Sequence, residues 1–342
     1  MESLENAIAK IKEEMPELDL REHESMKSHC SFKLGGEVRA YVAPANVWDM
    51  SKVFYILHHF DVAPLMVGRC TNLIIPEEGL DICVVSTEGL QALRMGETEN
   101  TIYAEAGVSL ARVAQFAQQK GLAGLEFASG IPGSVGGGVL MNAGAYGGEM
   151  KDVVDSVVMY YLTDQALTEV KGEDAGFAYR HSNFENLPCA ILGAVFKLTP
   201  DDPEAIAARM KEMNDKRREK QPLDMPSAGS AFKRPETGYA AALIDEAGLK
   251  GYTVGGAQVS EKHAGFVVNK GGATYDDVVE LMDHVRRVVY DKFKVTLMPE
   301  IRIYPKGMIL VDGWRRQKSS IMDAMADTAR EKVEEANKNG EN

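Results

Sequence analysis

The 342-residue chain has few cysteines, and its four, Cys30, Cys70, Cys83 and Cys189, lie far apart in the sequence. None forms a C-x-x-C pair, so the spacing supports neither a zinc site nor a disulfide framework. Free thiols in a reducing compartment are the better interpretation. We therefore expect no metal site.

Long apolar runs are also missing. No stretch of 18 or more apolar residues occurs, which argues against a membrane span. The first 20 residues alternate charged and apolar side chains like an amphipathic helix, without the apolar segment of a signal peptide. These absences predict a cytoplasmic protein.

Positive charge is scarce: the chain has 38 Lys and Arg but 51 Asp and Glu, which gives a formal net charge of −13. Nucleic acid and anionic membranes are therefore disfavoured as partners, because no net positive field attracts them. Local basic clusters can still bind a small anion. The length and the 45% hydrophobic content predict two or three globular domains.

Glycine, by contrast, is concentrated in the segment ASGIPGSVGGGVLMNAGAYGGE, residues 128–149. A flexible surface loop is one interpretation, but the intervening residues include apolar Ile131, Val135 and Val139, which a flexible loop does not need. A Gly-rich turn whose backbone N–H groups bind an anion such as a diphosphate is the favoured alternative. The spacing matches neither GxGxxG nor GxxxxGK[ST], so a Rossmann or P-loop site is disfavoured.

A second glycine turn, VGRCTNLI at residues 67–74, lies between two strand-like runs. Gly68, Thr71 and Asn72 could donate to phosphate oxygens, and Arg69 adds a charge. Alone this signal is weak, because turns between strands often contain Gly and Asn. Two such turns in one chain suggest a long, two-ended ligand.

The order of elements predicts an α+β protein. Strands and helices mix up to residue 200, and residues 156–172 read as a hairpin. A helix starting at Asp201–Pro203 and ending before Pro222 then opens a different part. The segment VTLMPEIRIYP reads as a closing strand, and residues 306–342 as a charged, solvated tail.

Several motifs occur here in one order: VGRCTN, GIPGSVGG followed by MNAGAYGGE, YRHS, RREKQPLDMPSAGSAFKRP, KHAGFVVN and PEIRI. Together they resemble the UDP-N-acetylenolpyruvoylglucosamine reductases (MurB), flavoenzymes of peptidoglycan synthesis, over roughly residues 25–305. The compact link after VVMYYLT resembles the shorter form, which lacks an extra substrate-capping loop. The resemblance implies reduction of UDP-N-acetylglucosamine enolpyruvate to UDP-N-acetylmuramate, with non-covalent FAD as cofactor and NADPH as co-substrate.

The resemblance also implies a domain plan. It places a first subdomain of a vanillyl-alcohol-oxidase-type FAD-binding fold at residues 1–78, completed by a closing strand at 296–305. A second FAD-binding subdomain would span 79–200, and an α+β substrate-binding domain 201–295. The substrates would be small molecules, and a monomer is favoured.

The glycine turns and a distant arginine then become the expected FAD contacts. These are Gly68, Arg69, Cys70, Thr71, Asn72, Gly107, Gly130, Gly133, Ser134, Gly136, Gly137, Asn142, Gly144, Ala145 and Arg302. One position departs from the family, which usually has Gly-x-Gly-Ser-Asn in the first turn where this chain has Cys70 in place of the second Gly. If that glycine takes a positive φ, Cys70 must be strained or the turn reshaped.

Three residues are the expected catalytic groups by the same resemblance. Ser230, in SAGSAFKRP, would be the proton donor, a task for a weak acid only where the acceptor is a strongly basic enolate. Arg180, in YRHS, would stabilise that enolate. Glu300, in PEIRI, would face the enolpyruvyl group, either protonated or orienting the donor. Without the resemblance, the favoured interpretations are a serine in a turn or helix cap, a surface arginine and an outward glutamate on an edge strand.

Substrate binding is expected from basic and aromatic residues of the same motifs. The resemblance makes Lys220 and Arg217 ligands of the UDP moiety, and adds Tyr179, Lys233 and His263 as further candidates. Two alternatives stay open from the residues: another FAD-dependent sugar or alcohol oxidoreductase on this fold, or a non-catalytic module that binds flavin or a nucleotide sugar. Neither glycine turn contains a histidine, which weighs against covalently attached flavin.

Overall fold

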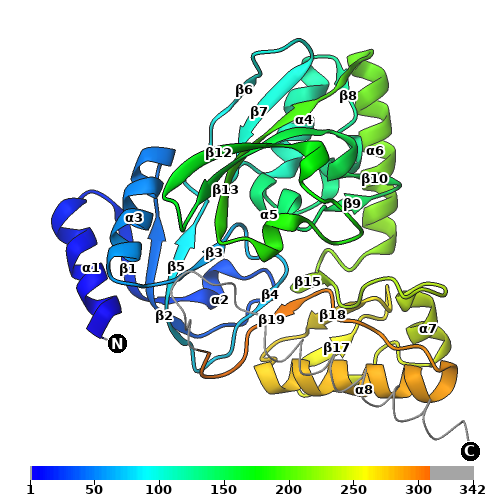
Figure 1. Ribbon diagram of the computed structural model, residues 1–342. Coiled ribbons are helices and arrows are strands. Elements are labelled where there is room, and N and C mark those ends of the chain that lie inside the picture. Colours follow the sequence, from blue (N-terminus) through cyan, green and yellow to red (C-terminus); the bar gives the residue numbers. More distant parts are fainter. Residues whose placement is uncertain (1, 309–342) are drawn as a thin grey trace, which may run out of the picture.

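The computed structural model describes residues 2–308, which form three units along the chain (Figure 1). The charged tail expected at residues 306–342 lies outside the described residues, apart from 306–308. The mixture of helices and strands agrees with the predicted α+β class. No helix of the described residues is both long and apolar enough to cross a membrane.

The first unit is a four-stranded sheet with helices against it. It comprises α1 (Glu2–Glu14), β1 (Asp19–Ser25), α2 (Met26–His29), β2 (Glu37–Ala43), α3 (Val47–His59), β3 (Pro64–Val67), β4 (Leu73–Ile74) and β5 (Leu80–Ser86). The strand order is β1-β2-β5-β3, with β5 parallel to both neighbours. Helix α3 starts where the Asn46 side chain accepts from the Asp49 N–H, and its buried face (Met50, Val53, Leu57) packs in a core shared with α1.

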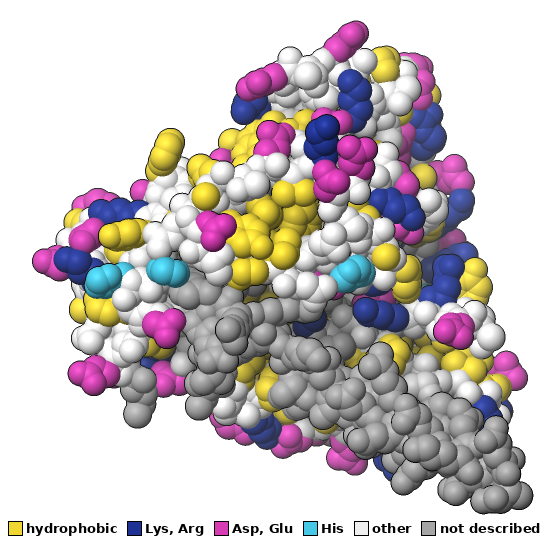
Figure 2. All heavy atoms as spheres, viewed as in Figure 1, with side chains coloured by type: hydrophobic (Ala, Val, Ile, Leu, Met, Phe, Trp, Pro, Cys, Tyr) yellow, Lys and Arg dark blue, Asp and Glu magenta, His cyan; other side chains and the backbone are white. Residues whose placement is uncertain are grey.

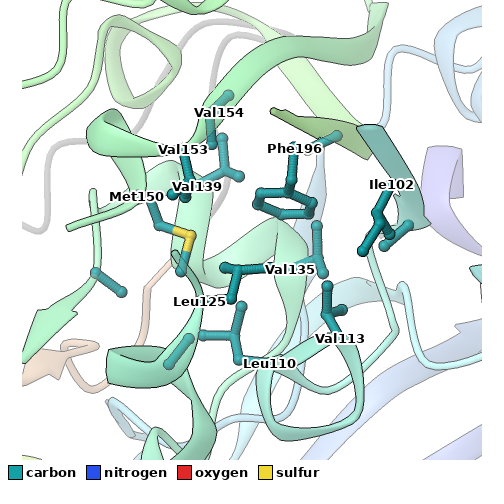
Figure 3. Close-up of a cluster of buried hydrophobic side chains, with 14 of the residues drawn as sticks. Ile102, Leu110, Val113, Leu125, Val135, Val139, Met150, Val153, Val154 and Phe196 are labelled. Carbon is teal, nitrogen blue, oxygen red and sulfur yellow. The ribbon is translucent and has the colours of Figure 1, made fainter. Parts of the chain in front are cut away.

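The second unit is an antiparallel sheet over a helical layer. It comprises β6 (Leu93–Met95), β7 (Thr101–Glu105), α4 (Leu110–Gln119), β8 (Leu122–Ala123), η1 (Glu126–Gly130), α5 (Val135–Leu140), β9 (Gly144–Ala145), β10 (Gly148–Glu149), η2 (Met150–Asp152), β11 (Val154–Tyr161), β12 (Ala166–Lys171), η3 (Gly172–Asp174), η4 (Asn183–Asn186), β13 (Cys189–Lys197), β14 (Thr199–Pro200) and α6 (Pro203–Lys220). The sheet order is β12-β11-β13-β7-β6, and the hairpin predicted at residues 156–172 is present as the antiparallel pair β11 and β12. Figure 3 shows its core, where Val135 and Val139 of α5 lie among side chains that include Phe196 and Ile102.

The third unit contains β15 (Ser227–Ser230), α7 (Ala240–Glu246), β16 (Thr253–Val254), β17 (Ala257–Val259), β18 (Phe266–Asn269), α8 (Tyr275–Phe293) and β19 (Arg302–Ile303). Its sheet runs β15-β18-β17-β16. The core beneath it includes Phe32, Leu34 and Ile74 of the first unit. The closing strand expected at 296–305 returns as β19, which pairs parallel to β4. The first and third units are therefore joined through one core.

Two elements fall on the other side of the expected boundaries. Strand β5 follows residue 78 yet lies in the middle of the first sheet, because a parallel pairing can reach across the chain. Helix α6 follows residue 200 yet packs on the second unit: Met210 and Met213 contact its core, and Arg209 donates to the Glu126 carboxylate at 2.7 Å. We propose boundaries near residues 90 and 221 instead.

Candidate active site

The first glycine turn lies between β3 and β4 and offers unused donors. The backbone N–H groups of Arg69, Cys70, Thr71 and Asn72 have no hydrogen-bond partner among the described residues. Cys70 has φ +49°, so this residue occupies the left-handed conformation that glycine favours. The turn keeps the backbone shape expected for a glycine there and places strain on Cys70 instead.

The second glycine segment is not an open turn, contrary to the interpretation from its composition. Residues 135–140 form the short helix α5, and the missing side chains of Gly136 and Gly138 face the protein interior. A Cβ on Gly136 would lie 3.0 Å from the Ala106 Cβ, and one on Gly138 3.0 Å from Leu110. The Gly136 N–H also donates to the Ala106 carbonyl at 2.9 Å, so we assign this residue to helix packing rather than to a cofactor contact.

The opposite face of α5 is the one that can receive a ligand. Gly137 is exposed, and its N–H has no hydrogen-bond partner within residues 2–308. The hydroxyl of Ser134, at the start of the helix, is buried and also without a hydrogen bond in the described part of the chain. A Cβ on Gly68 would collide with that hydroxyl, so the two glycine segments lie side by side.

A buried hydroxyl without a partner costs about 1–3 kcal/mol. Here it lies beside free backbone N–H groups from two segments, an arrangement suited to the phosphate oxygens of a dinucleotide. The residues present therefore fit FAD. We expect Ser134→Ala to weaken FAD binding while leaving the apoprotein as stable as before or slightly more stable. Thermal unfolding with and without FAD measures both; an apoprotein strongly destabilised by the change would contradict this assignment.

The two faces of α5 predict opposite outcomes for neighbouring glycines. Gly136→Val should destabilise the fold, because the larger side chain meets Ala106 inside the core. Gly137→Val should leave the apoprotein folded but reduce retained flavin, since its side chain would project where the ligand approaches. Far-ultraviolet circular dichroism and the flavin released on denaturation distinguish the two. Equal loss of fold in both variants would remove the distinction.

The other glycines expected to contact the cofactor, and Ala145, differ in what surrounds them. A Cβ on Gly107 would collide with the Thr87 carbonyl, which gives that glycine a packing role. Gly133 has room around it. Gly130 lies against Arg217 of α6, with the Arg217 Cδ at 3.1 Å from a Cβ placed there. Gly144 and Ala145 form β9, which pairs with β10 in a hairpin.

Asn142 and Arg302 engage protein groups rather than standing free for a cofactor. The Asn142 side chain is fully buried and its Nδ2 donates to the Glu149 carboxylate and to the Ala178 carbonyl, which uses both amide hydrogens. Arg302 pairs with Glu185, whose other oxygen contacts His181 Nδ1 at 2.8 Å. For Asn142 the structure replaces the expected cofactor contact by an internal one.

The three expected catalytic residues converge where the units meet. Arg180 Nε donates to Glu300 Oε1 at 2.6 Å, and both side chains are largely buried. The Glu300 N–H donates to the carbonyl of Ala231, the neighbour of Ser230, at 2.8 Å. The Ser230 hydroxyl makes no hydrogen bond among the described residues and follows Gly229, which has φ +80°. The guanidinium, the carboxyl and the hydroxyl thus come from three distant segments.

Burial dominates the electrostatics of Glu300. It raises the pKa of this carboxyl, although the charges of Arg180 and Lys233 act in the opposite direction. The first glycine turn contacts the same residue, because Asn72 Nδ2 donates to the Glu300 carbonyl at 3.1 Å. The backbone of Glu300 therefore links the first glycine turn to the expected catalytic residues.

Three of the expected substrate ligands, Arg217, Lys220 and His263, lie at or near the end of α6. Lys233 instead lies near Glu300, and the Tyr179 hydroxyl accepts from the Arg234 N–H at 3.0 Å. Arg217 has no carboxylate partner in residues 2–308, and burial lowers the pKa of its guanidinium. Burial also lowers the pKa of His263, with the charges of Lys250 and Lys220 acting in the same direction. Figure 2 shows Lys and Arg side chains on the right of the view, at the level where α6 ends, while both charge signs mix elsewhere on this face. A partly buried cation without a counter-ion is suited to an anionic ligand.

Comparison with known proteins decides the family. The FAD binding domain family matches residues 38–166, which hold both glycine segments. The C-terminal domain of UDP-N-acetylenolpyruvoylglucosamine reductase matches residues 221–304, which hold Ser230 and Glu300. A curated reductase of that name from Caldanaerobacter subterraneus is 43% identical over 296 residues, covering 86% of this chain and 97% of the relative. The chain belongs to the UDP-N-acetylenolpyruvoylglucosamine reductase family.

Other relatives agree with this membership. The reductase of Agathobacter rectalis is 42% identical over 308 residues, covering 86% of this chain and 97% of the relative. The crystal structure of the reductase (MurB) from Thermus caldophilus superposes with a TM-score of 0.70 at 31% identity, covering 84% of this chain and 99% of that one. The predicted fold class and FAD as cofactor are thereby confirmed.

Sequence reasoning missed Glu149 and Glu185. Glu149 contacts Asn142 at 2.8 Å and Lys151 at 3.0 Å, and Glu185 pairs with Arg302 and His181. Both residues lie beside motifs that were recognised, in GAYGGE and YRHSNFE. Their partners come from other segments, so no local spacing indicated the pairs.

Proposed function

We propose that the protein reduces UDP-N-acetylglucosamine enolpyruvate to UDP-N-acetylmuramate with NADPH, through non-covalently bound FAD. Family membership supports the reaction, and the Arg180–Glu300 pair beside Ser230 is the observation that carries it. When bound, FAD supplies the hydride chemistry that links the nicotinamide to the enolpyruvyl double bond. The N–H groups of residues 69–72, the Ser134 hydroxyl and the Gly137 N–H would hold its phosphates.

Arg180 is suited to bind the enolpyruvyl carboxylate and to stabilise the enolate that develops on it. Its guanidinium is always charged and uses Nε for Glu300, which leaves other N–H groups for the substrate. Its surroundings are largely dry, so the attraction to a developing negative charge is stronger than in water.

Ser230 would donate the proton that completes the reaction at the carbon bearing the carboxylate. Its hydroxyl makes no hydrogen bond within residues 2–308, and it lies at the end of β15 next to Ala231, whose carbonyl accepts from the Glu300 N–H. Glu300 would then orient Arg180 through the hydrogen bond that its Oε1 accepts from Arg180 Nε. The fixed geometry compensates for the weak acidity of a serine hydroxyl.

The UDP moiety would be held near the end of α6. Arg217 and Lys220 would contact the diphosphate. Further substrate contacts would come from His263 near Lys220, from Lys233 near Glu300 and from Tyr179, whose ring lies against Arg180. All these groups, like the catalytic ones, belong to one chain, so we propose a monomeric enzyme. Both co-substrates are soluble nucleotides, and we place the reaction in the cytoplasm.

The direct test is a steady-state assay with the holoenzyme. Purified protein should carry flavin that is released on denaturation, and NADPH oxidation should depend on the enolpyruvyl nucleotide. Ping-pong kinetics are expected because both co-substrates would use one pocket. Oxidation of a sugar or alcohol by this protein without NADPH, or inability to take up FAD, would overturn the proposal.

A further inference from the structure

The turn that carries Arg180 is held in an unusual backbone conformation. The Ala178 N–H donates to the His181 carbonyl at 3.0 Å, and the His181 N–H donates back to the Ala178 carbonyl at 3.1 Å. Between them, Arg180 has φ +52°, a conformation that glycine or asparagine adopts more easily at this point of a tight turn. Surrounding contacts must therefore keep the arginine in place.

Those contacts come from the end of the glycine segment. Asn142 Nδ2 donates to the Ala178 carbonyl at 2.9 Å, and the Ser182 hydroxyl donates to the Leu140 carbonyl at 2.6 Å. The two bonds attach the turn on either side of Arg180 to residues 140 and 142, at the C-terminal end of α5. Asn142 itself is fixed, because its Oδ1 accepts from the Lys151 N–H at 2.9 Å and its side chain is fully buried.

Asn142 also engages the second carboxylate near Arg180. Its Nδ2 donates to Glu149 Oε2 at 2.8 Å, and the same oxygen pairs with Lys151 Nζ at 3.0 Å. The charge of Arg180 reaches Glu149, so the two side chains are close enough to attract each other. With Glu149 occupied by Asn142 and Lys151, the guanidinium is left to pair with Glu300.

We propose that Asn142 is a positioning residue for Arg180: it fixes the turn at residues 178–181 and holds Glu149 away from the guanidinium. Asn142 touches neither substrate nor cofactor in this role. The proposal rests on the role of Arg180 in the proposed function. It predicts that loss of the Asn142 amide impairs the half-reaction with the enolpyruvyl nucleotide and spares the one with NADPH.

The key variant is Asn142→Gly, because glycine accepts the φ of +46° at this position without strain while removing the amide. Asn100→Gly is the matched control, since Asn100 also has a positive φ, of +59°, but lies in the turn before β7. Stopped-flow measurements of each half-reaction, flavin content and thermal unfolding are compared with the wild-type holoenzyme.

We expect Asn142→Gly to keep its flavin and its rate of reduction by NADPH within about twofold, and to slow reoxidation by the enolpyruvyl nucleotide at least tenfold. Asn100→Gly should match the wild type in both. Unimpaired reoxidation in Asn142→Gly would overturn the proposal. So would equal loss of both half-reactions together with flavin, which would make Asn142 a cofactor or folding residue.

Asn142→Asp adds a second measurement, the pH dependence of the reoxidation defect, which a purely structural role of Asn142 would not change. The introduced carboxylate would lie against that of Glu149, and two neighbouring carboxylates raise the pKa of one of them. As the pH falls, that carboxyl takes up a proton, and the pair again has a hydrogen-bond donor in place of the lost amide. The reoxidation defect of Asn142→Asp, relative to wild type at the same pH, should therefore shrink from about pH 8 to about pH 6, while that of Asn142→Gly stays constant. A constant defect in both variants would contradict the hydrogen-bonding role.

The Arg180→Met variant separates failure of this inference from failure of the proposed function. If Arg180→Met reoxidises normally, the catalytic role of Arg180 is wrong whatever Asn142 does. If Arg180→Met is slow and Asn142→Gly is not, only the positioning role of Asn142 is wrong.

Discussion

Ser230→Ala is expected to leave NADPH-driven reduction of the flavin nearly unchanged and to slow its reoxidation by the enolpyruvyl nucleotide by about 10²–10⁴-fold, the range that a positioned general acid contributes. The hydroxyl makes no hydrogen bond in the described residues, so its removal breaks no hydrogen bond there. Single-turnover kinetics of the two half-reactions measure the difference. Equal slowing of both would remove Ser230 from the proton-donor role.

Ser227→Ala is the matched control for this variant. Ser227 lies on the same strand, β15, and contributes its carbonyl rather than its side chain to the bond from the Ser31 hydroxyl. Its replacement should leave both half-reactions at wild-type rates. A defect of similar size in Ser227→Ala would show that the strand, and not the Ser230 hydroxyl, is what the reaction needs.

Arg180→Met is expected to reduce the rate of reoxidation at least about 10²-fold, as loss of a preorganised charge donor does elsewhere. It should also destabilise the protein by on the order of 3 kcal/mol, because Glu300 is left buried without its partner. Thermal unfolding and half-reaction kinetics measure the two effects. A variant with wild-type reoxidation would contradict the role of Arg180.

The stability defect of Arg180→Met should depend on pH in a definite direction. Burial already raises the pKa of Glu300, and removing Arg180 removes two influences that lower it. A carboxyl whose pKa is higher in the folded state favours folding while it is protonated, so stability is lost as the pH rises through that pKa. The double variant Arg180→Met, Glu300→Gln should therefore recover stability near neutral pH without recovering activity.

The proposed catalytic residues could be named from sequence because each lies in a recognisable local motif. YRHS, SAGSAF and PEIRI name Arg180, Ser230 and Glu300, and the structure brings all three to one region. The left-handed conformation of Cys70 could also be anticipated, because the residue stands where the family has glycine. The sequence was sufficient for features that depend on a residue's immediate neighbours along the chain.

Other features depend on partners that no local pattern reveals. Gly136 and Gly137 are adjacent and identical, yet one faces Ala106 and the other is exposed, because the stretch coils into a helix rather than an open turn. Strand β5 could not be placed in the first sheet from its own sequence, since parallel pairing joins segments distant along the chain. Nor could Asn142 be assigned to the Arg180 turn without the contact to Ala178.

The pairing of β19 with β4 has a consequence for how the chain folds during synthesis. The core that contains Phe32, Leu34 and Ile74 also needs Leu297, Ile301 and Ile303. Until residues 297–303 have been synthesised, Phe32, Leu34 and Ile74 therefore lack part of the core that buries them. The second unit, whose core is built from residues between Leu93 and Met213, can fold while the ribosome is still adding the rest. The segments at residues 32–34 and 74 are thus among the last to be covered, and Glu300 arrives just ahead of the strand that covers them.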